Sequence, residues 1–166
     1  MDTIYGKALN LSMSTMVGLG WIVLAAAMTG LWLVQHRTRN AGIVDAGWTF
    51  GVSGLAVFFA LAGPGWAPRR ATMAVLFVLW GARLGLYLLR DRVIGKPEEG
   101  RYVTLRQQWH PHAARRFFWF FQAQALAALF FALPPLLASA HTRASFHALE
   151  LAALALSDDQ KAKEAQ

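Results

Sequence analysis

The chain has 166 residues, of which 56% are hydrophobic and only 15% are charged, and its formal net charge is +7 at pH 7. This apolar content is higher than a soluble domain of this length normally carries. The positive charges lie in short stretches between apolar segments rather than in one basic arm, which argues against a nucleic-acid partner. The sequence contains no cysteine, so disulfide and thiolate chemistry are excluded.

Apolar runs of about twenty residues recur along the chain, and a membrane-spanning helix needs about that number. We therefore predict an all-α, multi-pass transmembrane helical bundle in the lipid bilayer, because a helix satisfies its own backbone hydrogen bonds there. The expected full spans are 13–34, 43–63, 71–90 and 117–138, followed by a short fifth helix at 146–156. The predicted domains are an N-terminal segment (1–12), a transmembrane domain (13–156) and a polar tail (157–166).

The first apolar run also raises the possibility of a secretory signal peptide. It is longer than a typical signal-peptide core, and the residues before it carry only Lys7 against Asp2. We therefore expect a membrane helix there rather than a cleaved leader.

Three polar residues interrupt the second apolar segment. Asp45, Thr49 and Ser53 are spaced four residues apart, which places them on one helix face. A polar stripe on an apolar helix is expected to face the interior of a bundle. The alternative is that Asp45 caps the helix while the two hydroxyls bond their own backbone. The spacing is compatible with both interpretations.

The third segment contains an arginine well inside an apolar helix. Trp80, Arg83, Tyr87 and Arg90 lie on one continuous face. An arginine near the bilayer centre costs roughly 2.5 to 3.5 kcal/mol on insertion scales. We expect Arg83 to face the interior, with Asp45 as its counter-ion if the second and third segments pack antiparallel. The alternative is that Arg83 extends to the membrane surface, about 10 Å away along the helix.

The stretch from 91 to 116 is predicted to be a long charged loop. Glu98, Glu99, Arg101 and Tyr102 mix both charges within five residues. The motif at 110–112 offers two imidazoles without a third ligand at a recognisable spacing, so no metal site is predicted.

The fourth segment begins with the aromatic run FFWFF and carries Gln122 one turn inside. This amide either faces a pocket or bonds a neighbouring helix. Two consecutive prolines at 134–135 are expected to kink or end the helix.

The distribution of Lys and Arg predicts the orientation. The stretches after the first and third segments carry two and seven such residues, against one, two and one for the N-terminus and the stretches after the second and fourth segments. The N-terminus is therefore expected outside and the charged 90–116 stretch in the cytoplasm, in the cell (inner) membrane.

Three stretches carry a family resemblance: NAGIVDAGWTFG (40–51), LWGARLGLYLLRDRVIGKPEEGRYVTLR (79–106) and FFWFFQAQALAALFFALPPL (117–136). Together they resemble the DUF1295 membrane proteins, a family related to steroid 5α-reductases and more distantly to isoprenylcysteine methyltransferases. The resemblance covers about residues 37 to 140. Glu99 stands where the family usually has aspartate before an Arg-Tyr pair.

The resemblance implies a reductase fold, with NADPH as the hydride donor and an apolar enone-like lipid or steroid as the acceptor. A tyrosine would donate a hydrogen bond to the developing enolate oxygen, and arginines would approach the cofactor phosphate. Carried onto this chain, the implied catalytic residues are Tyr87, Tyr102 and Glu98, the substrate-binding residues are Asp45, Trp48, Trp80, Arg83 and Gln122, and the cofactor-binding residues are Arg101 and Arg106.

Family members continue past the equivalent of this C-terminus, into a part that carries most cofactor contacts, so we expect a C-terminally truncated relative. Two alternatives stay open: a non-catalytic membrane remnant or interaction module, and a methyltransferase-like protein of the same fold. No repeat or pair of broken helices indicates a transporter, and nothing indicates an oligomeric state.

Overall fold

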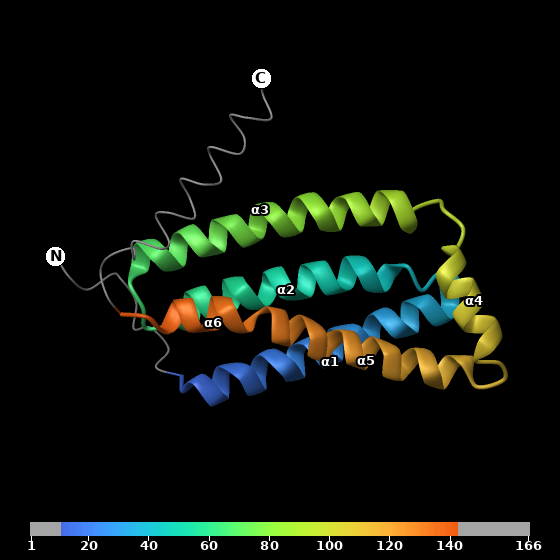
Figure 1. The fold of residues 1–166 in the computed structure, drawn as a ribbon, viewed down its shortest axis with the longest axis horizontal. Coiled ribbons are helices and arrows are strands. Elements are labelled where there is room, and N and C mark those ends of the chain that lie inside the picture. Colours follow the sequence, from blue (N-terminus) through green and yellow to red (C-terminus); the bar gives the residue numbers. More distant parts are fainter. Residues whose placement is uncertain (1–10, 143–166) are drawn as a thin grey trace, which may run out of the picture.

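The computed structural model describes residues 11–142, and within this range the secondary structure is helical. The helices are α1 (Met13–Thr38), α2 (Ile43–Ala62), α3 (Ala67–Arg92), α4 (Gly100–Gln108), α5 (Ala113–Phe131) and α6 (Leu133–Ala140). Helices α1, α2, α3 and the α5–α6 pair are long and apolar enough to cross a membrane. They run alongside one another, while α4 lies across one end of the bundle (Figure 1).

The predicted all-α bundle with four spans is therefore confirmed. The predicted fifth helix at 146–156 and the polar tail at 157–166 lie outside the described residues.

Local sequence explains where the helices begin and end. Helix α1 begins after Ser12, whose Oγ accepts a hydrogen bond from the Thr15 amide (3.1 Å). At the end of α2, the Arg70 guanidinium donates to the carbonyls of Ala60 (2.9 Å) and Gly63 (2.7 Å), which have no partner within the helix. The expected break at the two prolines is confirmed, because α5 ends at Phe131 and α6 starts at Leu133.

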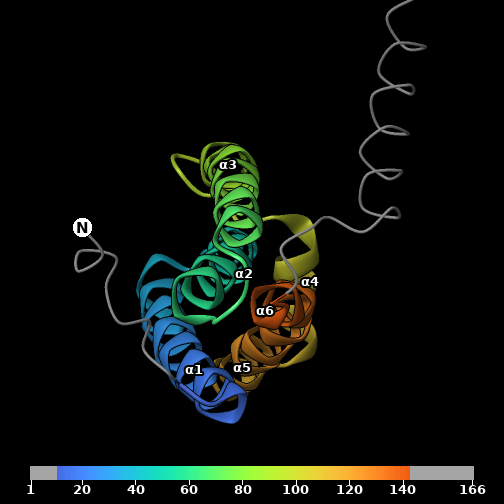
Figure 2. The ribbon, with the colours of Figure 1, turned by 90° about the vertical axis from the view of Figure 1, so that its left-hand side faces the viewer.

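Helix α2 is the centre of the bundle. Viewed along the bundle, it lies between α1, α3 and the α5–α6 pair (Figure 2). In the most apolar 18-residue stretch of α2, 50% of the residues are buried, against 11% in the corresponding stretch of α3. Helix α1 also packs against α5, where Phe117 and Phe121 are fully buried. Helix α3 therefore has one face on α2 and leaves most of its surface exposed.

Two glycines determine which face of α3 meets α2. A Cβ atom added at Gly81 would collide with Ser53, and one added at Gly85 would collide with the Phe50 ring. Small residues at this spacing allow membrane helices to approach closely. The two helices pack antiparallel, which was the condition for a pairing between Asp45 and the third segment (Figure 1).

The expectation that 91–116 is a loop is wrong in part, because Gly100–Gln108 forms α4. Tyr102, Leu105 and Trp109 lie three and four residues apart and pack against the core. A helix of nine residues is marginal in isolation. It forms here because this apolar face covers the end of the bundle.

Candidate functional site

The centre of the site is the Asp45 carboxylate in the first turn of α2. Its Oδ2 accepts hydrogen bonds from Arg92 (3.0 Å) on α3 and from Arg101 on α4, and its Oδ1 accepts from the Tyr102 hydroxyl (2.9 Å). Glu99 pairs with the same two arginines, at 3.0 Å from Arg92 and 3.3 Å from Arg101. We refer to Asp45, Arg92, Glu99, Arg101 and Tyr102 as the Asp45 cluster.

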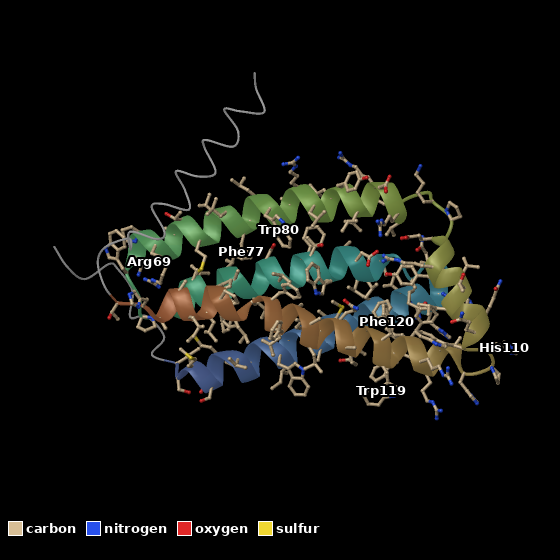
Figure 3. The ribbon with its side chains drawn as sticks, viewed as in Figure 1. Arg69, Phe77, Trp80, His110, Trp119 and Phe120 are labelled. Atoms are coloured by element: carbon tan, nitrogen blue, oxygen red, sulfur yellow. The ribbon has the colours of Figure 1, made fainter. Side chains whose placement is uncertain are left out.

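The members of this cluster differ in their access to solvent. The Asp45 side chain is 22% exposed and the Arg101 side chain 49%. Tyr102 is 2% exposed and packs edge-on against Phe120 of α5, near the end of the bundle that α4 covers (Figure 3). The cluster therefore runs from a buried phenol to a partly open guanidinium.

Burial raises the pKa of the Tyr102 phenol above its ordinary value of 10, and the negative charge and hydrogen bond of Asp45 act in the same direction. The nearby Arg101 guanidinium acts in the opposite direction but is outweighed. Tyr102 is consequently a neutral hydrogen-bond donor at physiological pH.

A second group, which we name the Glu98 clasp, lies beside the first. Glu98 accepts hydrogen bonds from Arg106 Nη2 (2.6 Å) and Nε (3.0 Å), and from the Ala41 amide (2.9 Å). Arg106 also donates to Gln35 Oε1 (3.3 Å) and lies 4.7 Å from the centre of the Phe117 ring. The clasp joins the end of α1 to α4 and α5, and the Glu98 side chain is only 9% exposed.

Both interpretations of the polar stripe on α2 prove partly right. Asp45 is held by other helices rather than capping its own, and the N-cap of α2 is Gly42. Thr49 donates to the backbone carbonyl of Asp45 (2.9 Å), as the local interpretation expected. Ser53 is buried against Gly81, and its hydroxyl has no hydrogen-bond partner among the described residues.

The two predicted substrate-binding aromatics contact each other, with Trp48 half-buried and Trp80 exposed. Trp48, half-buried on α2, makes edge contacts with Trp80 of α3 (6.4 Å between centroids) and Phe131 of α5 (5.4 Å). Figure 3 shows Phe77 and Trp80 on α3, and their rings lie 6.1 Å apart. These rings form an aromatic group beside α2 that begins at Trp48, three residues after Asp45.

Gln122 joins two helices. Its amide donates to Thr29 Oγ1 of α1 (3.0 Å), so the interpretation as a helix–helix bond is the one the structure supports. Its assignment to substrate binding is a prediction without a structural contact behind it.

The expectation that Arg83 faces the interior and pairs with Asp45 is wrong. Arg83 and Tyr87 are exposed, because Gly81, Gly85 and Leu88 take the face of α3 that meets α2. The two residues line an open groove of about 550 Å³ on the outer side of α3, which we name the outer α3 groove. The paired glycines are the sequence signal that identifies the inward face.

A second, apolar groove of about 770 Å³ lies between α1 and α2, with Leu89 of α3 at its edge. Ala46, Gly47 and Phe50 line it, whereas Asp45 does not, so the groove opens from another face of α2. Among residues 11–142, no group of three His, Cys, Asp or Glu side chains has the arrangement of a metal site.

A family model described as "Protein of unknown function (DUF1295)" matches residues 31–157, which include both charged groups. Comparison with curated proteins and with solved structures gave no match. The family match spans more than half of the chain, in agreement with the resemblance carried by the motifs. The chain belongs to the DUF1295 family of membrane proteins.

Proposed function

We propose that this protein is a membrane-embedded oxidoreductase that reduces the carbon–carbon double bond of an apolar enone, a lipid or steroid-like molecule, with NADPH. One observation carries the proposal: a buried, neutral Tyr102 held in place by the Asp45 carboxylate. The resemblance to steroid 5α-reductases supplies the reaction class.

In this reaction NADPH, when bound, supplies the hydride that reduces the β-carbon of the enone. The electron pair of the double bond then moves toward the carbonyl oxygen, and a proton added at the α-carbon completes the product. Tyr102 would stabilise the developing enolate by donating its hydrogen to that oxygen. The Tyr102 hydroxyl has one hydrogen to donate, so the hydroxyl must rotate away from Asp45 Oδ1 in order to donate to the substrate oxygen. Arg92 and Arg101 would keep Asp45 neutralised meanwhile.

The two arginines predicted to bind the cofactor differ in how well they fit a phosphate. Arg101 also has two carboxylate partners, Asp45 and Glu99, but its side chain is 49% exposed, so part of its guanidinium is accessible to an anion. Arg106 is 21% exposed, and Glu98 and Gln35 occupy its donors. Arg101 is therefore the better candidate, and Arg106 supports the position of α4.

The same end of the bundle bears on the orientation in the membrane. We propose that the end carrying α4 faces the cytoplasm, where nucleotide cofactors are present, and that the N-terminus lies outside the cell (inner) membrane. The excess of Lys and Arg at this end supports the proposal.

The decisive experiment measures NADPH binding and NADPH-dependent reduction of apolar enones by the full chain in lipid nanodiscs. Tyr102→Phe should lower kcat about a hundredfold, the effect of removing one donor to a developing oxyanion, and leave NADPH binding intact. Gln108→Ala, an exposed change on the same helix, is the matched control. Failure of the full chain to bind NADPH would overturn the proposal. Loss of activity in Tyr87→Phe but not in Tyr102→Phe would assign the donor to the other predicted tyrosine.

A second candidate is a non-catalytic membrane or interaction module. It is favoured by the pairing of Asp45, Glu98 and Glu99 with arginines, which is also what a purely structural clasp requires. For this candidate, Asp45→Asn should lower thermal stability, with no NADPH binding in either protein. The methyltransferase-like alternative predicts binding of S-adenosylmethionine in the same assay.

A further inference from the structure

The outer α3 groove gathers positive charge on a helix face that meets no other described helix. Its lining consists of Ala82, Arg83, Leu86, Tyr87, Arg90, Asp91 and Lys96. Three cations and one carboxylate leave an excess of two positive charges around about 550 Å³ of open space.

The cations of this groove differ from three arginines of the two charged groups beside Asp45 and Glu98. Arg92, Arg101 and Arg106 are each paired with a carboxylate. Within residues 11–142, by contrast, the side chains of Arg83, Arg90 and Lys96 have no ion-pair or hydrogen-bond partner. The three groove cations are therefore available to an external anion, and they line one groove together.

Among the three cations of the groove, Arg83 is unusual because it lies deepest in the membrane. Helix α3 has 26 residues and is about 39 Å long, against a hydrocarbon core of about 30 Å, so Arg90 near its end lies at headgroup level. Arg83 lies seven residues deeper, about 10 Å along the axis. Side chains on a helix tilt toward its N-terminus, which for Arg83 is away from the nearer membrane surface. An anion that reaches down to Arg83 would offset the cost of this position.

The third cation is held in place by the loop after α3. Gly95 has a positive φ of 68°, which allows the turn that follows the helix. The Asn40 side chain donates to the backbone carbonyls of Arg92 (3.1 Å) and Lys96 (3.3 Å), which fastens this loop to the start of α2. Lys96 consequently lines the same groove as Arg83, although thirteen positions separate them in the sequence.

We propose that the outer α3 groove binds the phosphate of an anionic phospholipid. Arg83, Arg90 and Lys96 would surround the headgroup phosphate, and the Tyr87 hydroxyl would donate to it. The acyl chains would lie along the exposed apolar surface of α3 that contains Leu76, Leu79 and Leu86. The excess of two positive charges favours a lipid with net negative charge over a zwitterionic one. This site is separate from the Asp45 cluster and does not depend on the proposed reductase activity.

The test compares lipid retention by native mass spectrometry of the full chain, purified from an equal mixture of phosphatidylglycerol and phosphatidylcholine. The wild type should retain phosphatidylglycerol preferentially, and Arg83→Gln with Arg90→Gln should lower that preference about tenfold. The matched control is Arg115→Gln with Arg116→Gln, which removes the same charge from exposed positions at the start of α5, at the same end of the bundle (Figure 1). Equal losses in both double variants would overturn the proposal, because they would indicate general surface attraction.

Two further measurements keep the proposal testable if the double variant does not fold. Lys96→Gln changes a loop side chain only and should lower phosphatidylglycerol retention, whereas Arg83→Lys should retain most of it. Inorganic phosphate in place of the lipid should give no increase in melting temperature. An increase as large as that given by phosphatidylglycerol would identify a site for soluble phosphate and overturn the lipid assignment.

Discussion

At the scale of single residues, burial decides which of the ion pairs matter. Glu98 and Glu99 are adjacent in the sequence and both pair with arginine, yet their side chains are 9% and 36% exposed. An exposed pair contributes little because water screens it and its side chains lose freedom. Removing one partner of a buried pair leaves an uncompensated charge, which costs far more.

We therefore predict that Glu98→Gln destabilises the protein by about 2 to 4 kcal/mol, because it leaves the partly buried Arg106 without a counter-charge and weakens the bond to the Ala41 amide. Glu99→Gln should cost less than about 1 kcal/mol and serves as the matched control. Thermal or denaturant unfolding in detergent measures both. Equal effects would show that Glu98 is not the clasp between α1 and α4.

The pH dependence of Tyr102 follows from its raised pKa. The unfolded phenol ionises near its ordinary pKa of about 10, whereas the folded phenol stays protonated to higher pH. The contribution of Tyr102 to stability is therefore complete below about pH 10 and is lost as the pH rises through the folded pKa. The wild type should lose more stability above pH 10 than Tyr102→Phe does.

Phenolate absorbance tests whether ionisation of Tyr102 causes this loss of stability. The difference in absorbance between the wild type and Tyr102→Phe should show no ionisation near pH 10 while the protein is folded. A difference spectrum that titrates at the ordinary tyrosine pKa in folded protein would contradict the burial of this phenol.

At the scale of elements, the rotation of α3 about its own axis is set by the small residues on the face that packs against α2. Trp80, Arg83, Tyr87 and Arg90 form a conspicuous polar and aromatic stripe in the sequence, which suggests an inward face. The inward face is instead the one with the smallest side chains, Gly81 and Gly85, because close approach of two helices in a membrane is driven by packing rather than by polarity. Arg83 is therefore on the outer face of α3, where it lines the outer α3 groove.

We predict that Gly81→Val destabilises the bundle by about 1 to 3 kcal/mol, because the new side chain would collide with the Cβ and hydroxyl of Ser53 and push α3 from α2. Gly30→Val is the matched control, since a Cβ at Gly30 in α1 meets no atom within 4 Å. The melting temperature in detergent distinguishes the two. Comparable losses would mean that the cost comes from helix propensity and not from the α2–α3 contact.

At the scale of the whole molecule, the charged groups gather at one end of the bundle. The ends of α1 and α3 and the start of α2 meet α4 there, whereas the opposite end carries the α2–α3 connection and the end of α6 (Figure 1). The Asp45 cluster, the Glu98 clasp and the part of the outer α3 groove around Arg90 and Lys96 therefore lie at the same end of the bundle, while Arg83 extends the groove deeper into the membrane.

Because the chain contains no cysteine, single introduced cysteines report orientation directly. With the proposed topology, Gln108→Cys on α4 should react with a membrane-impermeant thiol reagent only in inside-out vesicles. Ala67→Cys, exposed at the start of α3 at the opposite end, should react only in right-side-out vesicles or intact cells. The reverse pattern would place the α4 end outside and would also remove the access to cytoplasmic NADPH that the proposed function requires.

The sequence by itself determined the spans, because hydrophobic length is a local property and the bilayer imposes it on each segment separately. It also identified the break at the two prolines, which comes from the missing amide and needs no neighbour. The charged cluster could be located along the chain from the density of ionisable residues between 90 and 106. The Asp45–Tyr102 hydrogen bond could not be derived from spacing, since 57 positions separate the two residues.

Only the tertiary structure decided which partner each charge takes. Asp45 had several arginines within a plausible register, and the small side chains of Gly81 and Gly85 rotate α3 so that Arg92 faces Asp45 while Arg83 faces outward. Helix α4 likewise exists only because the bundle end offers an apolar surface for Tyr102 and Leu105. Pairing and rotation depend on how helices pack together, a property that none of the segments carries alone.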